Sequence, residues 1–215
     1  MPIFRPFCME TNFKEENGYQ GVGSFIIEIV KIFILAFLII VPIRLFLFQP
    51  FFVQGNSMHP TYRNGEYLII NELGYKRTTI GIGEKEFFTV DYFKELERFD
   101  VAVFRYPKDP DKYFIKRVVG LPGEKVEIKD GKVKIYNSEN PNGLMLNEEE
   151  HLTDKILTAN AVHESPWQLE EDEYFMMGDN RGGSSDSRLW GPLSKDKVIG
   201  RAIFRAWPFN RINIL

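Results

Sequence analysis

The sequence predicts a mainly β protein, in which a domain of antiparallel sheets follows one N-terminal transmembrane helix. Residues 24–48 form an almost uninterrupted apolar run, whereas the chain beyond it has short β-branched and aromatic runs separated by turn residues. No long apolar pattern with a period of 3.6 residues occurs in that second part. We therefore divide the chain into a short tail (1–23), an anchor helix (24–48) and a β-rich domain (49–215).

The anchor segment reads SFIIEIVKIFILAFLIIVPIRLFLF. As a helix it spans about 37 Å, more than the roughly 30 Å of a bilayer's hydrocarbon core. A buried helix of a soluble core is one alternative, but few such helices are apolar on all sides for so long. A cleaved secretory signal is another, but bulky residues follow the run where a small-x-small cleavage site would be needed. An uncleaved anchor fits best.

The basic residues around this helix indicate its orientation. Arg5, Lys14 and Lys31 lie toward one end, and Arg44 and Arg63 lie toward or beyond the other. Because positive charge accumulates on the cytoplasmic side, this distribution favours a cytoplasmic N-terminus and a domain on the outer side of the membrane.

Eight runs predict the strands of the domain. They are Phe51–Gln54, Tyr67–Ile70, Val101–Tyr106, Tyr113–Val119, Lys125–Ile128, Lys132–Tyr136, Tyr174–Met177 and Val198–Trp207. Lys129-Asp130-Gly131 joins two alternating runs and predicts a β-hairpin. Residues 137–171 are polar, contain the acidic run Glu148-Glu149-Glu150, and are predicted to be a surface insertion.

Composition excludes several classes of function. The chain has 27 Lys and Arg against 30 Asp and Glu, a net charge of -3 that does not suit a protein whose partner is nucleic acid. One cysteine, Cys8, excludes an intramolecular disulfide framework and a multi-cysteine zinc site. The three histidines have no metal-ligand spacing, so we expect neither a metal nor a cofactor.

The first segment that could carry chemistry directly follows the anchor and reads QGNSMHPT from residue 54. Gly55 permits unusual backbone angles and Pro60 restricts the exit, so Ser57 could be held on an exposed corner as a nucleophile. An ordinary serine in a turn explains the same pattern. His59 could serve as its base, but it has no evident carboxylate partner.

The second segment, Tyr113–Gly120, reads as a strand. Alternate residues of a strand share a face, so Phe114, Lys116 and Val118 point the same way. Burial between apolar neighbours would lower the pKa of the lysine and let it act as a base. Two alternatives stay open: Arg117, on the opposite face, is the buried residue, or Lys116 lies at a solvated sheet edge.

The third segment, Gly178–Arg188, has two aspartates and two arginines that alternate among Gly, Asn and Ser. This pattern suits a rigid, salt-bridged loop, although an ordinary surface turn has the same composition. A calcium loop is excluded because Arg181 stands at the third position and no bidentate glutamate stands at the twelfth.

Behind an anchor, the order GNSMHPT, KRVVGLPGE and GDNRGGSSDSR resembles the bacterial type I signal peptidases over residues 40–207. The resemblance implies a membrane-bound serine endopeptidase, with the β fold shared with SOS repressors, that removes signal peptides from secreted preproteins after small-x-small motifs. It implies no cofactor or metal. Its partners are the preproteins and the lipid bilayer, and its place is the bacterial cell membrane.

The resemblance also assigns residues. Ser57 matches the nucleophile and Lys116 its general base. Ser184 matches a serine that hydrogen-bonds the lysine amine and orients it. The remaining matches are a structural ion pair beneath the site and two supporting residues, namely Asp186 with Arg188, and Asp179 with Arg181.

The substrate side of the site rests on two further matches. Met58 matches a residue near the substrate pocket, and the backbone N–H of Ser57 is the expected first oxyanion donor. Gly55 stands where some members have a serine whose hydroxyl is the second donor, so the identity of that donor stays open. Substrates are expected to bind extended along a sheet edge.

Two other functions compete with this interpretation. A self-cleaving Ser–Lys protease of the SOS-repressor type would have an N-terminal pair of DNA-binding helices, and an anchor stands there instead. A catalytically silent, membrane-anchored scaffold would not need Ser57, Lys116 and Ser184 together.

Overall fold

A computed structural model of the chain comprises two units, residues 1–41 and 42–215, which are described separately. The structure describes residues 22–46, 48–76, 78–82, 85–91, 94–149, 152 and 166–215. Most of the predicted tail, with Cys8, and part of the predicted insertion therefore lie outside the described residues.

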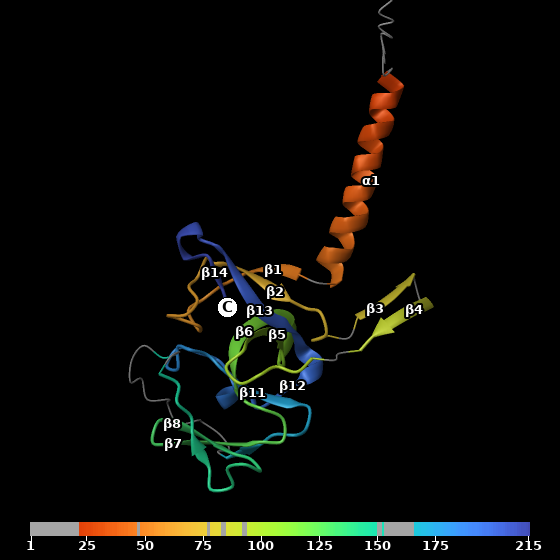
Figure 1. Ribbon diagram of the computed structural model, residues 1–215. Helices are drawn as coiled ribbons and strands as arrows, with labels where there is room; N and C mark the ends of the chain where they lie inside the picture. The colour runs from red at the N-terminus through yellow and green to blue at the C-terminus, as the bar shows by residue number, and fades with distance from the viewer. Residues whose placement is uncertain are drawn as a thin grey trace, which may run out of the picture. The chain divides into compact units, whose positions relative to one another are not determined.

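The predicted anchor is a continuous helix, α1 (Val22–Phe46), which begins and ends two residues earlier than the sequence predicts (Figure 1). Its segment Val22–Val41 has the length and the apolar composition needed to cross a membrane. None of the side chains in that segment is buried. The side chain of Arg44 lies outside the described residues.

The second unit is built from short strands. They are β1 (Phe48–Phe52), β2 (Tyr67–Asn71), β3 (Thr78–Ile82), β4 (Lys85–Val90), β5 (Val101–Tyr106), β6 (Asp109–Gly120), β7 (Lys125–Lys129), β8 (Lys132–Tyr136), β9 (Leu144–Met145), β10 (Trp167–Gln168), β11 (Glu173–Met177), β12 (Leu193–Ser194), β13 (Val198–Trp207) and β14 (Asn213–Ile214). The short helices are α2 (Ser187–Trp190), η1 (Lys195–Lys197) and η2 (Phe209–Arg211).

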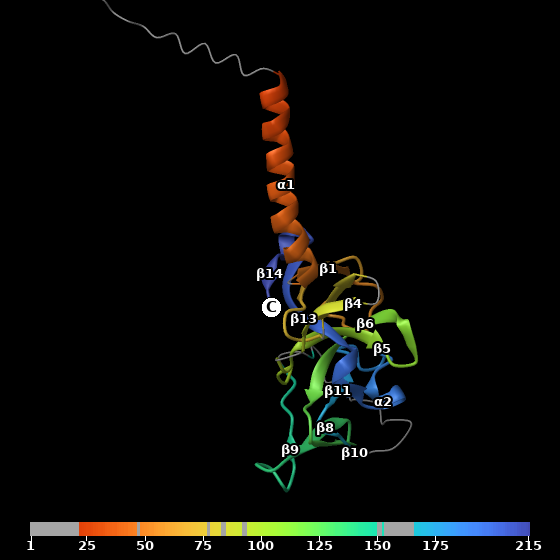
Figure 2. The ribbon, with the colours of Figure 1, turned by 90° about the vertical axis from the view of Figure 1, so that its right-hand side faces the viewer.

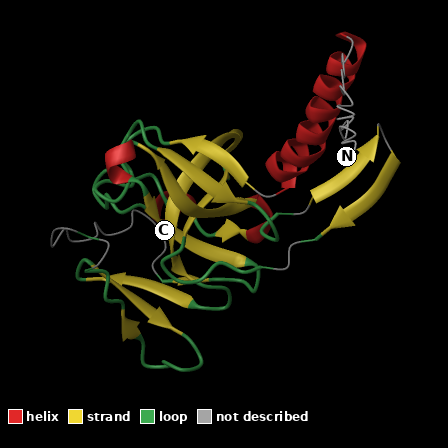
Figure 3. Cartoon of the chain, turned by 45° about the horizontal axis from the view of Figure 1, so that its top comes forward, coloured by secondary structure: helices red, strands yellow, loops and turns green. Residues whose placement is uncertain are grey.

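The main sheet has the strand order β1-β2-β13-β5-β6-β11-β12, with β14 paired to β13. Figure 2 labels five strands of this order, namely β1, β13, β5, β6 and β11. A smaller sheet has the order β10-β7-β8-β9, and β3 and β4 form a hairpin of their own (Figure 3). Every strand pair in these sheets is antiparallel, which confirms the predicted fold class.

All eight predicted strands are present, with ends that differ by a few residues. The largest shift at a start is in β6, which begins four residues before Tyr113 and pairs with β5 over most of its length. The predicted hairpin joins β7 to β8, where Asp130 and Gly131 both have positive φ, as a two-residue hairpin turn requires. The β3–β4 hairpin was not predicted, because glycine and charged residues break the apolar alternation there.

Part of segment 137–171 is integral to the fold and is not a surface insertion. It supplies β9 and β10, the two outer strands of the smaller sheet. It also contributes buried side chains, Trp167 and Leu169, to the hydrophobic cluster beneath that sheet. These two strands and the two buried side chains could not be predicted from the sequence. The segment is acidic, and its apolar residues are too few and too scattered to form a strand pattern.

Strand β6 positions the site because its second half is covered on both faces. Val118 belongs to one hydrophobic cluster, Val119 to a second, and Ile115 packs against a third. Consecutive residues of β6 point to opposite faces and are nevertheless both buried. This explains how two adjacent cations, Lys116 and Arg117, are both almost inaccessible to solvent.

Candidate active site

Ser57 lies on a tight turn after β1, as the sequence predicts. Gly55 has a φ of 86°, a left-handed value that disfavours any residue with a side chain, and its N–H donates to Asn64 Oδ1 at 2.9 Å. The N–H of His59 donates to Asn56 O at 3.1 Å and closes the turn around the serine. These bonds fix the backbone that presents the Ser57 hydroxyl.

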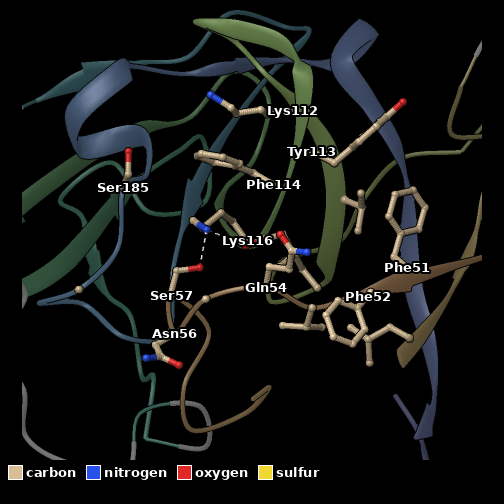
Figure 4. A pocket seen from close by; sticks show the side chains of 16 residues that line it. Phe51, Phe52, Gln54, Asn56, Ser57, Lys112, Tyr113, Phe114, Lys116 and Ser185 are labelled. Carbon is tan, nitrogen blue, oxygen red and sulfur yellow. Dashed lines mark hydrogen bonds between the residues drawn. The ribbon is translucent and has the colours of Figure 1, made fainter. Parts of the chain in front are cut away.

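Lys116 reaches Ser57 from β6 (Figure 4). Its Nζ lies 2.7 Å from Ser57 Oγ and donates a second hydrogen bond to Ile115 O at 2.8 Å. Only 3% of the lysine is exposed, so it does not lie at a solvated edge. The aromatic ring of Phe114 lies 5.1 Å from Nζ and covers the amine on one side.

Burial lowers the pKa of Lys116 from 10.5 to about 8. The carboxylates of Asp186 and Asp179 act in the opposite direction, since negative charge favours the ammonium form, but burial dominates. A lysine with this pKa has a sizeable neutral fraction near neutral pH, which is the form that can accept a proton.

Arg117, which the sequence offered as the alternative buried cation, is also buried, but its partner and its role differ from those of Lys116. Its guanidinium makes two hydrogen bonds to Asp179, at 2.8 and 2.7 Å, and a third to Phe99 O at 2.8 Å. This bidentate pair joins β6 to the start of the catalytic loop, which we define as residues 178–188. Asp179 therefore supports the site through an arginine adjacent to Lys116.

Asp186 and Arg188 form the predicted ion pair inside the catalytic loop. Arg188 Nε and Nη2 each lie 2.8 Å from a different Asp186 oxygen. Arg188 Nη2 also donates to Arg181 O at 2.7 Å, and Asp186 Oδ2 accepts the N–H of Gly178 at 3.0 Å. The pair thus ties together the beginning, the middle and the end of the loop.

Gly178 is the point at which the loop meets the nucleophile turn. A Cβ atom at this position would lie 2.2 Å from Ser184 Oγ and 2.5 Å from Ser57 O. The N–H of Asn180 donates to Ser57 O at 3.0 Å, and its side-chain amide donates to Asn56 O at 3.1 Å. Nothing in the local sequence marks Gly178, because the convergence of these chain segments depends on the fold.

Ser184 lies beside the dyad but makes no hydrogen bond to Lys116. Its Oγ is buried and has no hydrogen-bond partner within the described part of the chain. The amine of Lys116 donates instead to Ser57 and Ile115. The role of Ser184 in orienting the lysine stays a prediction.

Arg181 does not pair with either aspartate of its own loop, as an internally salt-bridged loop would require. Its guanidinium binds both carboxylate oxygens of Glu148, one of them at 3.0 Å. Glu148 belongs to the acidic run that the sequence analysis assigned to a surface insertion. The only sequence signal for this pairing was an acidic residue in a polar segment, which is usually solvated.

A groove of about 680 Å³ leads to the dyad (Figure 4). It is lined by residues 51–57, by residues 112–116, and by Leu68, Val103, Gly183 and Ser185. Met58 does not line the groove; it is 1% exposed and packs in the cluster beneath β1 and β2. Within the described residues, no three His, Cys, Asp or Glu side chains gather as a metal site would require.

The groove separates two strand edges that lack partners among the described strands. β1 pairs only with β2, and β11 pairs with β6 only from Arg117 onward. Residues 109–116 of β6 therefore have β5 on one side and an open edge on the other. An extended peptide could hydrogen-bond to such an edge.

Comparison with known proteins gives consistent matches. The family described as "Signal peptidase, peptidase S26" matches residues 26–207. Signal peptidase I of Pseudomonas fluorescens is 31% identical over 220 residues, covering 88% of this chain and 76% of that protein. Signal peptidase I T of Bacillus subtilis is 30% identical over 204 residues, covering 94% and 96%. A crystal structure of a signal peptidase I from Enterococcus faecalis is 31% identical, covers 50% of this chain and 97% of that chain, and has a TM-score of 0.40.

Proposed function

The chain belongs to the peptidase S26 family of signal peptidases, serine endopeptidases that remove signal peptides, and we propose that it does this chemistry with Ser57 as nucleophile and Lys116 as general base. The observation that carries the proposal is the 2.7 Å contact between Lys116 Nζ and Ser57 Oγ inside a groove. Family membership decides against both the self-cleaving repressor type and the silent scaffold.

The contacts of Lys116 suit proton transfer in both directions. A neutral amine has two N–H groups and one lone pair, and Ile115 O accepts one of those hydrogens. The lone pair can then face Ser57 Oγ, accept its proton and leave the oxygen to attack the scissile carbonyl carbon. The resulting ammonium returns the proton to the departing amine, and a water then hydrolyses the acyl ester, with Lys116 again accepting a proton.

The developing oxyanion needs donors, and the N–H of Ser57 is the first. It donates to no acceptor within the described residues, so it is available to the substrate. The N–H of Gly55 is not, because Asn64 already accepts it. Gly55 therefore permits the turn through its positive φ, but it supplies neither a hydroxyl nor a free N–H as an oxyanion donor.

The groove suits an extended preprotein segment that adds to the open edges of β1 and β6. Phe51, Phe52 and Phe114 give its walls an apolar surface, which suits small apolar side chains at the cleavage site. We propose cleavage after small-x-small motifs on this basis and on the family resemblance.

We further propose that α1 is a membrane anchor, with the N-terminus in the cytoplasm and the catalytic domain on the outer side of the bacterial cell membrane. The apolar segment Val22–Val41 and the distribution of basic residues support this topology. Ser57 follows the end of α1 by eleven residues, so the nucleophile stays near a bilayer that also holds the signal peptide of the substrate.

We expect the cleavage rate to rise with pH through about 8. Below this pKa, most Lys116 amines carry a proton and cannot accept one from Ser57, so the rate falls about tenfold for each pH unit. Above it, the neutral fraction saturates and the rate reaches a plateau. Measurement of kcat between pH 6 and 10 checks this, and a rate that is flat or falls across that range contradicts a lysine base.

The proposed function itself is tested by cleavage of a preprotein with the purified full chain. We expect Ser57→Ala to reduce kcat by at least about 10⁴-fold, because the Ser57 hydroxyl is the one that contacts the Lys116 amine. Ser138→Ala, at an exposed serine outside the groove, is the matched control and should cleave like the wild type. Equal activity of the two variants would refute a serine mechanism at this site.

A further inference from the structure

We propose that Glu148 is a positioning residue that holds the catalytic loop in its active arrangement through Arg181. The proposal rests on the proposed function, since it concerns the same Ser57–Lys116 dyad. It also gives a role to the acidic segment between β9 and β10. We call residues 146–149 the strap, because they run from the smaller sheet to the catalytic loop.

The strap has a fixed origin on the smaller sheet. β9 pairs with β8 through Ile135 and Leu144. One residue beyond β9, the N–H of Leu146 donates to Val133 O at 2.9 Å, and its side chain packs against the hydrophobic cluster of that sheet. Glu148 follows two residues later, so its backbone lies close to a residue that is held by a hydrogen bond and by packing.

The ion pair at the end of the strap is buried on both sides. The side chains of Arg181 and Glu148 are 2% and 9% exposed, and the guanidinium binds both carboxylate oxygens. Removing one partner of a buried pair leaves an uncompensated charge, so such pairs strongly resist separation. The next residue, Glu149, is exposed, so the two neighbouring glutamates differ in their environment.

Arg181 is connected to the reacting groups through its own backbone. Its carbonyl oxygen accepts Arg188 Nη2 at 2.7 Å, and Arg188 binds both oxygens of Asp186. Asp186 in turn accepts the N–H of Gly178, the residue that abuts Ser184 and the Ser57 carbonyl. A shift of Arg181 would therefore be passed to the dyad by four successive contacts.

The ion pair with Glu148 adds a side-chain restraint to the backbone hydrogen bonds in the middle of the catalytic loop. One end is held by Asp179 on Arg117, and the other by the Asp186–Arg188 pair. Between them the loop has two consecutive glycines, residues 182 and 183, both exposed and conformationally permissive. Side-chain docking of Arg181 on the strap restrains this middle section.

The test compares Glu148→Gln with Glu149→Gln in the purified full chain. Both variants lose one negative charge from the same run, but only the first loses the buried ion pair. We expect Glu148→Gln to lower kcat by about 10- to 100-fold, since displacement of reacting groups by about 1 Å costs rates of that order. KM should change less, because β1 and β6 form most of the groove. Glu149→Gln should stay within about twofold of wild type.

Assays are run at a temperature at which circular dichroism shows every variant fully folded, so a loss of kcat does not report unfolding. Arg181→Met alone and combined with Glu148→Gln completes a double-mutant cycle. If Glu148 acts through Arg181, the double variant is no slower than the worse single variant. Additive losses would overturn the proposed link.

Glu148→Asp keeps the charge on a shorter side chain, and an intermediate kcat is expected. If Glu148→Gln folds poorly, Glu148→Asp and Glu149→Asp replace the first pair of variants. A position-148 variant that stays folded and cleaves like its position-149 counterpart overturns the proposal while leaving the Ser–Lys dyad intact. Absence of cleavage by the wild type, or full activity of Ser57→Ala, would instead refute the proposed function.

Discussion

Lys116→Met is expected to yield a protein that unfolds at a higher temperature than the wild type and cleaves preprotein at least about 10⁴-fold more slowly. The two effects have one cause. Burial disfavours the ammonium and lowers its pKa from 10.5 to about 8, which at about 1.4 kcal/mol per unit is a cost near 3 kcal/mol in the folded state at neutral pH. Methionine fills similar space without a charge, but its thioether sulfur is far too weak a base to accept the proton of Ser57.

The pH dependence of stability provides a sharper check. Below pH 8, Lys116 is protonated in the folded and the unfolded chain, so the wild type bears the full burial cost. Between about 8 and 10.5 only the unfolded chain binds the proton, and the stability of the wild type therefore rises with pH. The advantage of Lys116→Met should shrink across that range.

Thermal unfolding of both proteins at pH 7 and pH 10 measures this difference. Lys108→Met, at an exposed lysine in the β5–β6 turn, is the control and should change neither stability nor cleavage appreciably. A Lys116→Met protein that is less stable than wild type at both pH values, or that still cleaves, would contradict the role of this lysine.

Gly178→Ala is expected to reduce kcat by about 100-fold. The added methyl group would lie 2.2 Å from Ser184 Oγ and 2.5 Å from Ser57 O, and the second of these is a backbone atom that cannot rotate away. Either the catalytic loop or the nucleophile turn must move. Because the turn carries Ser57, the distance from its Oγ to Lys116 Nζ changes with it.

Gly182→Ala is the matched control, since a Cβ there has no atom within 4 Å. It introduces the same methyl group into the same loop and should leave kcat near the wild-type value. Steady-state cleavage by the two variants, with circular dichroism to establish folding, separates crowding at the dyad from a general effect of alanine in the loop. Equal rates would show that the close approach at Gly178 is not required.

The sequence was sufficient for features that depend on local pattern. β-branched and aromatic runs located β5, β8 and β13 at their observed bounds. The resemblance of three ordered motifs to a known family identified Ser57 and Lys116 as the pair that the fold brings together. These predictions succeeded because strand patterns, turn residues and motifs can each be recognised in a short stretch of sequence.

The partners of the buried charges were not predictable in the same way. A single strand pattern allows only one face to be buried, so it offered Lys116 or Arg117 as the buried cation, whereas β6 buries both. The pairings of Arg117 with Asp179 and of Arg181 with Glu148 join segments 62 and 33 residues apart. No local rule connects such segments, because their proximity depends on how the two sheets and the catalytic loop pack.

The open edges of β1 and β6 have a consequence for which proteins this enzyme processes. Backbone N–H and C=O groups on a strand edge do not discriminate between side chains. They can bind any peptide whose own backbone is extended. A segment that remains helical up to the scissile bond satisfies its backbone internally and has no groups to offer. If preproteins add to these edges as proposed, we expect cleavage only where the helix of the substrate ends before the scissile bond, whichever small residues stand there.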